Sequence, residues 1–194
     1  MNRFLFITIA VAVLSTGCLT RSYVPTARYA LAPQPTVEPG VSTGQSLAVR
    51  LLIAAQPYNQ PIVYRTSDFE VGTFPYAEWA EPPREVVTRA LMDALTASGR
   101  FSDVGYSLDQ TRPNLILSGE VRRFDILRDE EPWKALCEVR LELRKAIEKE
   151  LIWQDTLVAT KDLTGNDVAD APAAMSSAIS EIVNKAVRDI GASL

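Results

Sequence analysis

Histidine is absent from this chain of 194 residues. Its absence excludes Ser-His-Asp and Cys-His nucleophile systems, zinc sites with histidine ligands, and the usual general base near neutral pH. Gly-rich phosphate-binding loops are missing as well. The net charge of −4 provides no basic surface of the kind that binds nucleic acid. Carboxylate or lysine catalysis has no supporting motif, so we expect no enzyme, no cofactor and no metal.

Cysteine is scarce, and the two cysteines lie in very different surroundings. Cys18 ends the stretch MNRFLFITIAVAVLSTGC, in which Arg3 precedes an apolar run from Phe4 to Leu14. That run has the length of a signal-peptide core and is too short to span a bilayer comfortably. Residues 1–17 resemble a bacterial lipoprotein signal with its lipobox. In such proteins the matching cysteine receives a thioether-linked diacylglycerol and becomes the first residue of the mature chain.

Lipidation at Cys18 would make membrane attachment effectively permanent. Each buried methylene contributes ~0.8 kcal/mol, and two or more acyl chains suffice where one is marginal. The alternatives are an ordinary signal peptide with an incidental cysteine, or an N-terminal membrane helix. Leu19, rather than aspartate, follows the cysteine. By resemblance to enterobacterial sorting rules, this favours the outer membrane, with the domain facing the periplasm.

Proline and glycine are concentrated between the anchor and the first long apolar run. We expect residues 18–45 to be a lipidated N-terminus and an extended tether of up to roughly 80 Å, with Arg28–Leu31 (RYAL) as a short strand that could join the domain. Residues 46–194 are expected to form one globular periplasmic domain, because 47% of the chain is hydrophobic.

The segment from Ile62 to Val104 predicts a strand, a turn, a strand, an aromatic corner, a helix and a strand. Ile62–Arg65 and Phe69–Phe74 are expected to pair as a hairpin, and Ser46–Ala54 to form a buried central strand. After Pro82 and Pro83, apolar residues follow helical spacing up to Gly99, which suits a left-handed C-cap.

Three long strands are expected in succession, at 114–124, 137–147 and 151–160. In the second strand, Cys137, Val139, Leu141 and Leu143 alternate with charged residues, which predicts an antiparallel meander with one wet face. The last element is an amphipathic helix from about Ala171 to Gly191, with Asp170 as a natural N-cap. The fold class is α+β: a mixed, largely antiparallel sheet with two amphipathic helices packed on one face.

Few side chains outside the core are candidates for chemistry. Cys137 is expected to be a buried, unpaired structural thiol. The acidic residues near Trp79 and in the 128–133 loop, and those from Asp162 to Asp170, are interpreted as solvated loops rather than catalytic pairs or a calcium site. The aromatic residues Tyr76, Trp79 and Trp133 are candidates for partner binding. Tyr76 and Trp79 could instead pack the start of the helix onto the sheet.

The order of these signals resembles the ABC-type transport auxiliary lipoprotein family, which accompanies MCE-type lipid transport systems. The resemblance rests on Cys18, RYAL, LAVRLLIA followed by Pro57-Tyr58, and IVYRTSDFEV leading to WAEP at 79–82. An amphipathic helix ending in Gly99-Arg100-Phe101 completes the pattern. Pro83 departs from the leucine expected after WAEP.

The resemblance implies a non-catalytic subunit that docks a transporter to the outer membrane. Its partners would be an MCE-domain protein and the permease and ATPase of the inner membrane, with phospholipid or another hydrophobic molecule as cargo. Three alternatives stay open. The chain could be an adaptor or activator of another envelope assembly, in cell-wall synthesis or secretion. It could be an envelope hydrolase that uses carboxylates, or a domain that carries lipid between its helices and its sheet.

Overall fold

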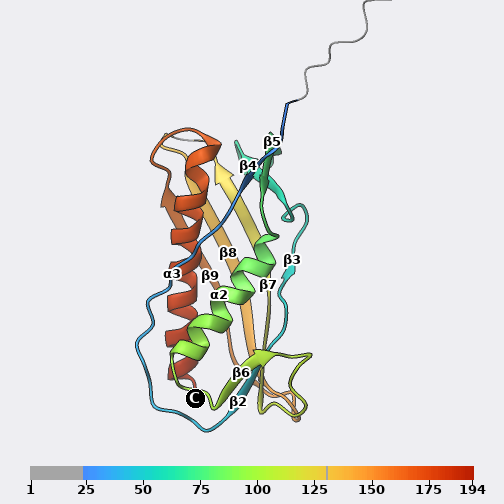
Figure 1. The fold of residues 1–194 in the computed structure, drawn as a ribbon, viewed down its shortest axis with the longest axis vertical. Helices are drawn as coiled ribbons and strands as arrows, with labels where there is room; N and C mark the ends of the chain where they lie inside the picture. Colours follow the sequence, from blue (N-terminus) through green and yellow to red (C-terminus); the bar gives the residue numbers. More distant parts are fainter. Residues whose placement is uncertain (1–23, 130) are drawn as a thin grey trace, which may run out of the picture.

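The computed structural model describes residues 24–129 and 131–194. These residues form one mixed sheet with two α-helices on one face, as predicted (Figure 1). The strands are β1 (Ala27–Tyr29), β2 (Ser46–Val49), β3 (Ile53–Ala54), β4 (Pro61–Arg65), β5 (Val71–Trp79), β6 (Asp103–Tyr106), β7 (Leu115–Leu127), β8 (Lys134–Lys145) and β9 (Leu151–Asp162). The helices are α2 (Pro83–Ala97) and α3 (Ala171–Ala192), the latter preceded by the 3-10 turn η1 (Val168–Asp170).

Strand β7 organises the sheet, because both of its edges are used along most of its length. One edge pairs antiparallel with β8, which in turn pairs antiparallel with β9. The other edge pairs in succession with three short parallel strands, β2, β3 and β4, placed end to end. The register places Leu47 opposite Leu115 at one end and Val63 opposite Asp125 at the other. The sheet then continues from β4 to β5 and β1, and from β2 to β6.

The strand predicted at Ser46–Ala54 is divided into β2 and β3. Between them the chain leaves the ladder, and the backbone N–H of Leu52 donates to the Thr88 hydroxyl of α2 at 3.1 Å. Leu52 is buried by this step, so the interruption serves packing between the sheet and α2. Periodicity alone could not reveal a break inside a continuous apolar run.

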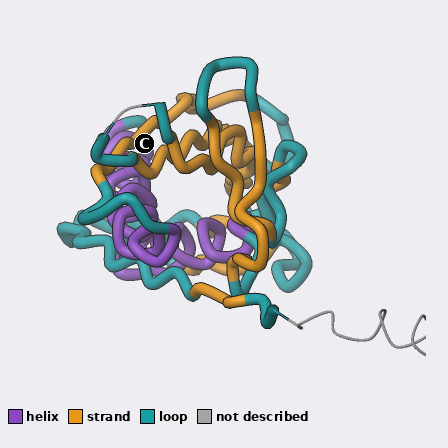
Figure 2. The backbone as a smooth tube through the Cα atoms, turned by 90° about the horizontal axis from the view of Figure 1, so that it is seen from above, coloured by secondary structure: helices purple, strands orange, loops and turns teal. Residues whose placement is uncertain are grey.

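The meander of β7, β8 and β9 confirms the alternation read from the sequence. Cys137, Val139, Leu141 and Leu143 are all buried on the face that the helices cover. Helix α3 packs along β8 and β9, and α2 packs against α3, β6 and β7. Seen end-on, the strands curve around the two helices (Figure 2). The core lies between these two layers.

The ends of the helices follow the predicted signals at α2 but not at α3. Pro82 precedes α2, Pro83 opens it, and Gly99 beyond its end has a φ of +62°. Asp170 was expected to cap α3, yet its side chain forms no cap bond to the helix. It instead accepts a hydrogen bond from the Thr164 hydroxyl at 3.0 Å, and Asp167 caps η1 by accepting from the Ala169 N–H. The preceding 3-10 turn therefore displaces the cap by three residues.

Candidate functional site: the N-terminal segment and the β4–β5 hairpin

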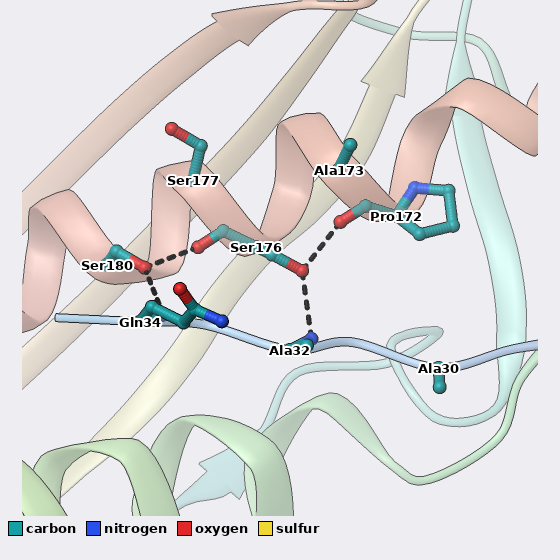
Figure 3. A pocket seen from close by; sticks show the side chains of 8 residues that line it. All are labelled: Ala30, Ala32, Gln34, Pro172, Ala173, Ser176, Ser177 and Ser180. Carbon is teal, nitrogen blue, oxygen red and sulfur yellow. Dashed lines mark hydrogen bonds between the residues drawn. The ribbon is translucent and has the colours of Figure 1, made fainter.

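The chain from residue 30 to residue 43 lies on the domain rather than extending away from it as a free tether. The N–H of Ala32 donates to the Ser176 hydroxyl at 3.0 Å, and the N–H of Gln34 donates to the Ser180 hydroxyl at 2.9 Å. Each serine also donates to a backbone carbonyl one turn back in α3 (Figure 3). Each hydroxyl therefore links the backbone of the N-terminal segment to the backbone of α3. Small side chains on α3 allow this close approach.

The same segment is fastened again at the far end of α3. The N–H of Gly40 donates to the Ser98 carbonyl and that of Thr43 to the Arg100 carbonyl, both at 2.8 Å. The Arg100 guanidinium lies so close to Gly40 and Gly191 that a Cβ on either glycine would come within 2.6 Å of it. The prediction of an extended tether over residues 18–45 is therefore wrong for residues 30–43, which are part of the folded domain. Only residues 19–26 separate Cys18 from β1.

The β4–β5 hairpin is more irregular than predicted. Its second strand begins at Val71 rather than Phe69 and continues to Trp79, so the expected aromatic corner is part of the strand. The pairing shifts between Pro61–Glu78 and Val63–Thr73, which leaves extra residues in β5. Tyr76 lies in this bulge with a φ of +59°, a conformation that costs a non-glycine residue about 1 kcal/mol or more.

An aromatic cluster fills the space between this hairpin and the loop that joins β7 to β8. The Arg128 guanidinium carbon lies 4.6 Å from the ring centre of Tyr64, 5.4 Å from that of Phe74 and 4.3 Å from that of Trp133. Phe74 packs edge-on against Tyr64, and its ring centre is 5.9 Å from that of Trp133. Cation–π contacts of this kind stabilise a cation that is partly removed from water. The cluster holds the hairpin in a fixed position.

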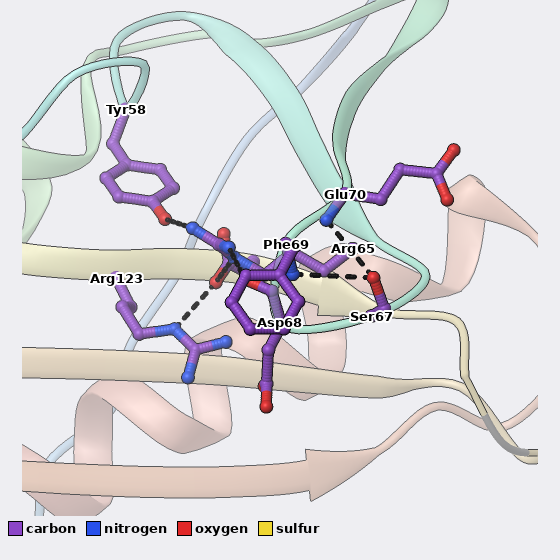
Figure 4. Close-up of polar contacts among 8 residues, drawn as sticks. Tyr58, Arg65, Ser67, Asp68, Phe69, Glu70 and Arg123 are labelled. Carbon is purple, nitrogen blue, oxygen red and sulfur yellow. Dashed lines mark hydrogen bonds and ion pairs between the residues drawn. The ribbon is translucent and has the colours of Figure 1, made fainter.

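A buried carboxylate supports the same hairpin from the face of the sheet opposite the helices. Asp125 is 0% exposed, and its Oδ2 accepts from Arg65 Nε at 2.8 Å and from Arg123 Nε at 2.9 Å (Figure 4). Arg65 also donates to the Tyr58 hydroxyl at 3.1 Å. Burial, and secondarily Asp125, raises the pKa of Tyr58. Two guanidinium groups compensate one buried charge, which alone would be costly.

The network continues into the turn of the hairpin, residues 66–70. Arg65 donates to the Asp68 carbonyl at 3.2 Å, and the Thr66 hydroxyl donates to the Glu70 carboxylate at 2.7 Å. The Ser67 hydroxyl accepts from the N–H groups of Phe69 and Glu70 (Figure 4). The turn is therefore ordered by its own side chains. It presents Phe69, which is 98% exposed, at the tip.

The three aromatic residues singled out in the sequence have three different environments. Trp79 is 1% exposed and packs edge-on against Phe124 in the core. Trp133 is half-buried in the Arg128 cluster. Tyr76 is 56% exposed on the bulge of β5. The packing interpretation therefore holds for Trp79, while Tyr76 and Trp133 border the same end of the domain. Cys18 lies outside the described residues.

Several of the residues considered for catalysis or metal binding form structural contacts. Glu78 pairs with Arg28 at 3.7 Å and Glu81 with Arg89 at 2.8 Å. Asn166 accepts from the Trp133 N–H. Within residues 24–129 and 131–194, no group of three histidine, cysteine or acidic side chains could hold a metal ion. Burial raises the pKa of the Cys137 thiol, so the thiolate that reactive cysteines require is disfavoured.

Hollows on the described surface lie outside the core. One runs between the 30–34 segment and α3 and is lined largely by alanine and serine (Figure 3). Others are lined by mixed polar and apolar side chains at loops, such as that around Arg112 and Ile147. The space between helices and sheet is filled by the core cluster. In the described part of the chain, no helix has the length and apolar character needed to cross a membrane.

The fold and the site together define a class of protein, a two-layer α+β domain. Its N-terminal segment is bound along helix α3, and the described chain begins at the same end as the ordered β4–β5 hairpin. Residues 29–187 match the family of ABC-type transport auxiliary lipoprotein components, and the chain belongs to this family. As its members are lipoproteins, the chain is a membrane-anchored protein of the cell envelope that serves a transport system as an auxiliary component.

Two solved structures share the fold. A Xanthomonas campestris protein described as DUF330 is 22% identical with a TM-score of 0.75, and the match covers 86% of this chain and 96% of that one. An uncharacterized protein is 12% identical with a TM-score of 0.67, covering 86% and 99% of the two chains. The comparison with curated proteins found no match.

Sequence reasoning missed Asp125, Arg65 and Phe69. The sequence did contain a signal for Asp125. The apolar residues Leu115, Leu117 and Val121 have odd numbers, whereas Phe124 and Ile126 have even numbers. All five are buried, so a bulge must lie between Val121 and Phe124, where the pairing register does shift. The bulge turns Arg123 and Asp125 to the face opposite the helices. Phe69, between two acidic residues, gave no periodic signal.

Proposed function

We propose that this chain is a non-catalytic, lipid-anchored auxiliary subunit of an MCE-type ABC transport system. It docks the transporter to the outer membrane, so that lipids or other hydrophobic molecules pass between the membranes. The match over residues 29–187 to the transport auxiliary lipoprotein family carries this proposal. The lipobox at Cys18 supports the anchor, which is a thioether-linked diacylglycerol at the membrane surface. Partners are an MCE-domain protein and the permease and ATPase of the inner membrane.

The arrangement of side chains favours a binding role over catalysis. Glu78 and Glu81 form ion pairs, and the one described cysteine is buried. The filled core supports docking rather than transport of cargo inside this domain. Tyr76 and Trp133 are the proposed partner-binding aromatic residues, whereas Trp79 is buried in the core. Tyr76 is the most accessible of the three.

Crosslinking in native membranes followed by affinity purification tests this function. Wild-type protein is expected to recover an MCE-domain protein and its permease, and Cys18→Ala is expected to recover less of both. Tyr76→Ser should weaken recovery, whereas Tyr106→Ser, at an exposed tyrosine of β6, serves as the matched control. Recovery of cell-wall synthases or secretion channels without any transporter subunit would contradict the proposal. It would favour an adaptor of another envelope assembly.

A further inference from the structure

The short connection between Cys18 and β1 limits how far the domain can stand from its anchor. Ala27 is the first residue of β1, so nine residue steps join it to Cys18. At about 3.3 Å per step, these span at most ~30 Å. The anchored cysteine remains at the membrane surface, because its acyl chains are buried in the bilayer. The membrane surface therefore lies within ~30 Å of Ala27.

The β4–β5 hairpin occupies much of that distance. Ala27 pairs with Ala77 in parallel register, and β5 extends from Ala77 back to Val71 beside the path of the incoming chain. The six residue steps from Ala77 to Val71 span at most about 20 Å, and the turn 66–70 adds further reach. Figure 1 shows the start of the described chain at the same end of the molecule as this hairpin. A fully extended connection thus places Cys18 only about 10 Å beyond Val71, where β5 begins.

The side chains at this end suit the boundary between lipid and water. Phe69 is 98% exposed at the tip, and Val24 and Val71 are exposed apolar residues on the same end. Single exposed apolar residues are ordinary on protein surfaces. Here, however, the most exposed one lies where the anchor brings the membrane. Aromatic side chains are favoured at membrane interfaces, where their rings reach headgroup level.

We infer that the tip of the β4–β5 hairpin rests in the interfacial layer of the membrane that holds the lipid anchor, with Phe69 as its inserted side chain. This inference rests on the proposed lipidation of Cys18 but not on the identity of the transporter. The Asp125–Arg65 network and the hydrogen bonds of the turn hold the tip in shape before contact. A preordered tip loses less conformational entropy when it binds.

The charges beside Phe69 specify the kind of lipid surface. Asp68 and Glu70 flank the ring, and Arg65 and Arg123 behind them are engaged by the buried Asp125. An anionic surface would repel the two acidic side chains. The tip therefore fits a zwitterionic surface, and anionic lipid is not expected to strengthen the contact.

The test uses the complete, lipidated protein reconstituted in phosphatidylethanolamine-rich vesicles. Phe69→Cys is labelled with the polarity-sensitive fluorophore NBD, and Leu108→Cys is the matched control. Leu108 is 96% exposed, and its loop follows β6, away from the anchor end. Labelling is selective, because Cys18 is blocked by its thioether and Cys137 is buried. Neither replaced side chain contributes to the core, so both variants should fold.

The label at position 69 is expected to show a blue shift of emission and quenching by lipids that carry a quencher. A label introduced by Val71→Cys should be quenched less, and the label at position 108 should behave as in water. Replacing half of the lipid with phosphatidylglycerol should not increase the quenching at position 69. Equal, water-like emission at positions 69 and 108 in protein that is demonstrably anchored would overturn the inference, while leaving the transport role intact. Protein that fails to acquire the anchor would overturn both this inference and the lipid-anchored docking role proposed above.

Discussion

Two antiparallel hairpins of this domain, β7–β8 and β4–β5, differ in the regularity of their pairing and in the burial of their side chains. In the β7–β8 hairpin the apolar residues alternate, the pairing runs along nearly the whole length of both strands, and the inner side chains are fully buried. In the β4–β5 hairpin the pairing is short, a bulge holds Tyr76 at positive φ, and Phe69 and Val71 are exposed. The first hairpin has the alternation, continuous pairing and burial that stabilise a folded sheet. The second departs from regular pairing and burial at the end of the domain where the described chain begins. Strain and exposed aromatic residues there suit contact with another surface.

The contrast extends to the two polar networks on the face of the sheet opposite the helices. Each consists of one carboxylate between two arginines: Asp125 with Arg65 and Arg123, and Glu142 with Arg140 and Arg144. The Asp125 side chain is 0% exposed, and that of Glu142 is 22% exposed. Similar chemistry therefore forms a buried support beneath the β4–β5 hairpin and a partly hydrated network on the meander.

The largest effect is expected from Gly119→Ala, which disturbs the regular hairpin. A Cβ on Gly119 would lie 2.2 Å from the Arg140 carbonyl oxygen of β8, a backbone atom that cannot turn aside. We expect a loss of about 2–3 kcal/mol in the free energy of unfolding, measured by urea titration. Gly105→Ala is the control, because its Cβ would meet only the Gln110 side chain at 3.3 Å. A loss in Gly119→Ala as small as that in the control would mean that β7 and β8 can separate at little cost.

Asp125→Asn tests whether the buried network supports the irregular hairpin. The amide cannot compensate two guanidinium groups, so we expect about 2 kcal/mol of destabilisation. Glu142→Gln, in the hydrated network, should cost less than about 1 kcal/mol. Urea titration measures both, and hydrogen exchange should show faster exchange in β4 and β5 for Asp125→Asn alone. Matching losses in the two variants would remove the distinction between the networks.

A smaller and more local effect is expected where the N-terminal segment binds α3. Ser180→Ala removes the acceptor for the Gln34 N–H, which contributes about 1 kcal/mol. Opening of the segment should become about fivefold more frequent, measured as faster hydrogen exchange of the neighbouring Ala32 N–H, whose own acceptor Ser176 is retained. Ser177→Ala is the control, because Ser177 lines the same groove without a bond to the segment (Figure 3). Unchanged exchange in Ser180→Ala would indicate that the other contacts, such as those around Arg100, hold the segment.

Much of the regular half of the domain was predictable from local pattern. The meander, both helices and the Gly99 C-cap follow from periodicity and end signals that a short window contains. The placement of β2, β3 and β4 along β7 was not predictable, because pairing between residues such as Val63 and Asp125 depends on contacts remote in sequence. The binding of the N-terminal segment was also missed. Its proline-rich composition is typical of a tether, and its partners are two serines of a distant helix.

The smallest expected effect concerns the strain stored at Tyr76. Tyr76→Gly relieves a positive φ, at the cost of greater freedom in the unfolded chain, and should stabilise the domain by roughly 0.5 kcal/mol. Lys149→Gly, at the other described non-glycine residue with positive φ, separates the backbone effect from the role of the ring. Thermal unfolding measures the stability change, and recovery of the transport partners measures the binding. We expect partner recovery to fall only for Tyr76→Gly. If binding persists while stability rises, the strain at Tyr76 serves the geometry of the bulge rather than the display of its ring.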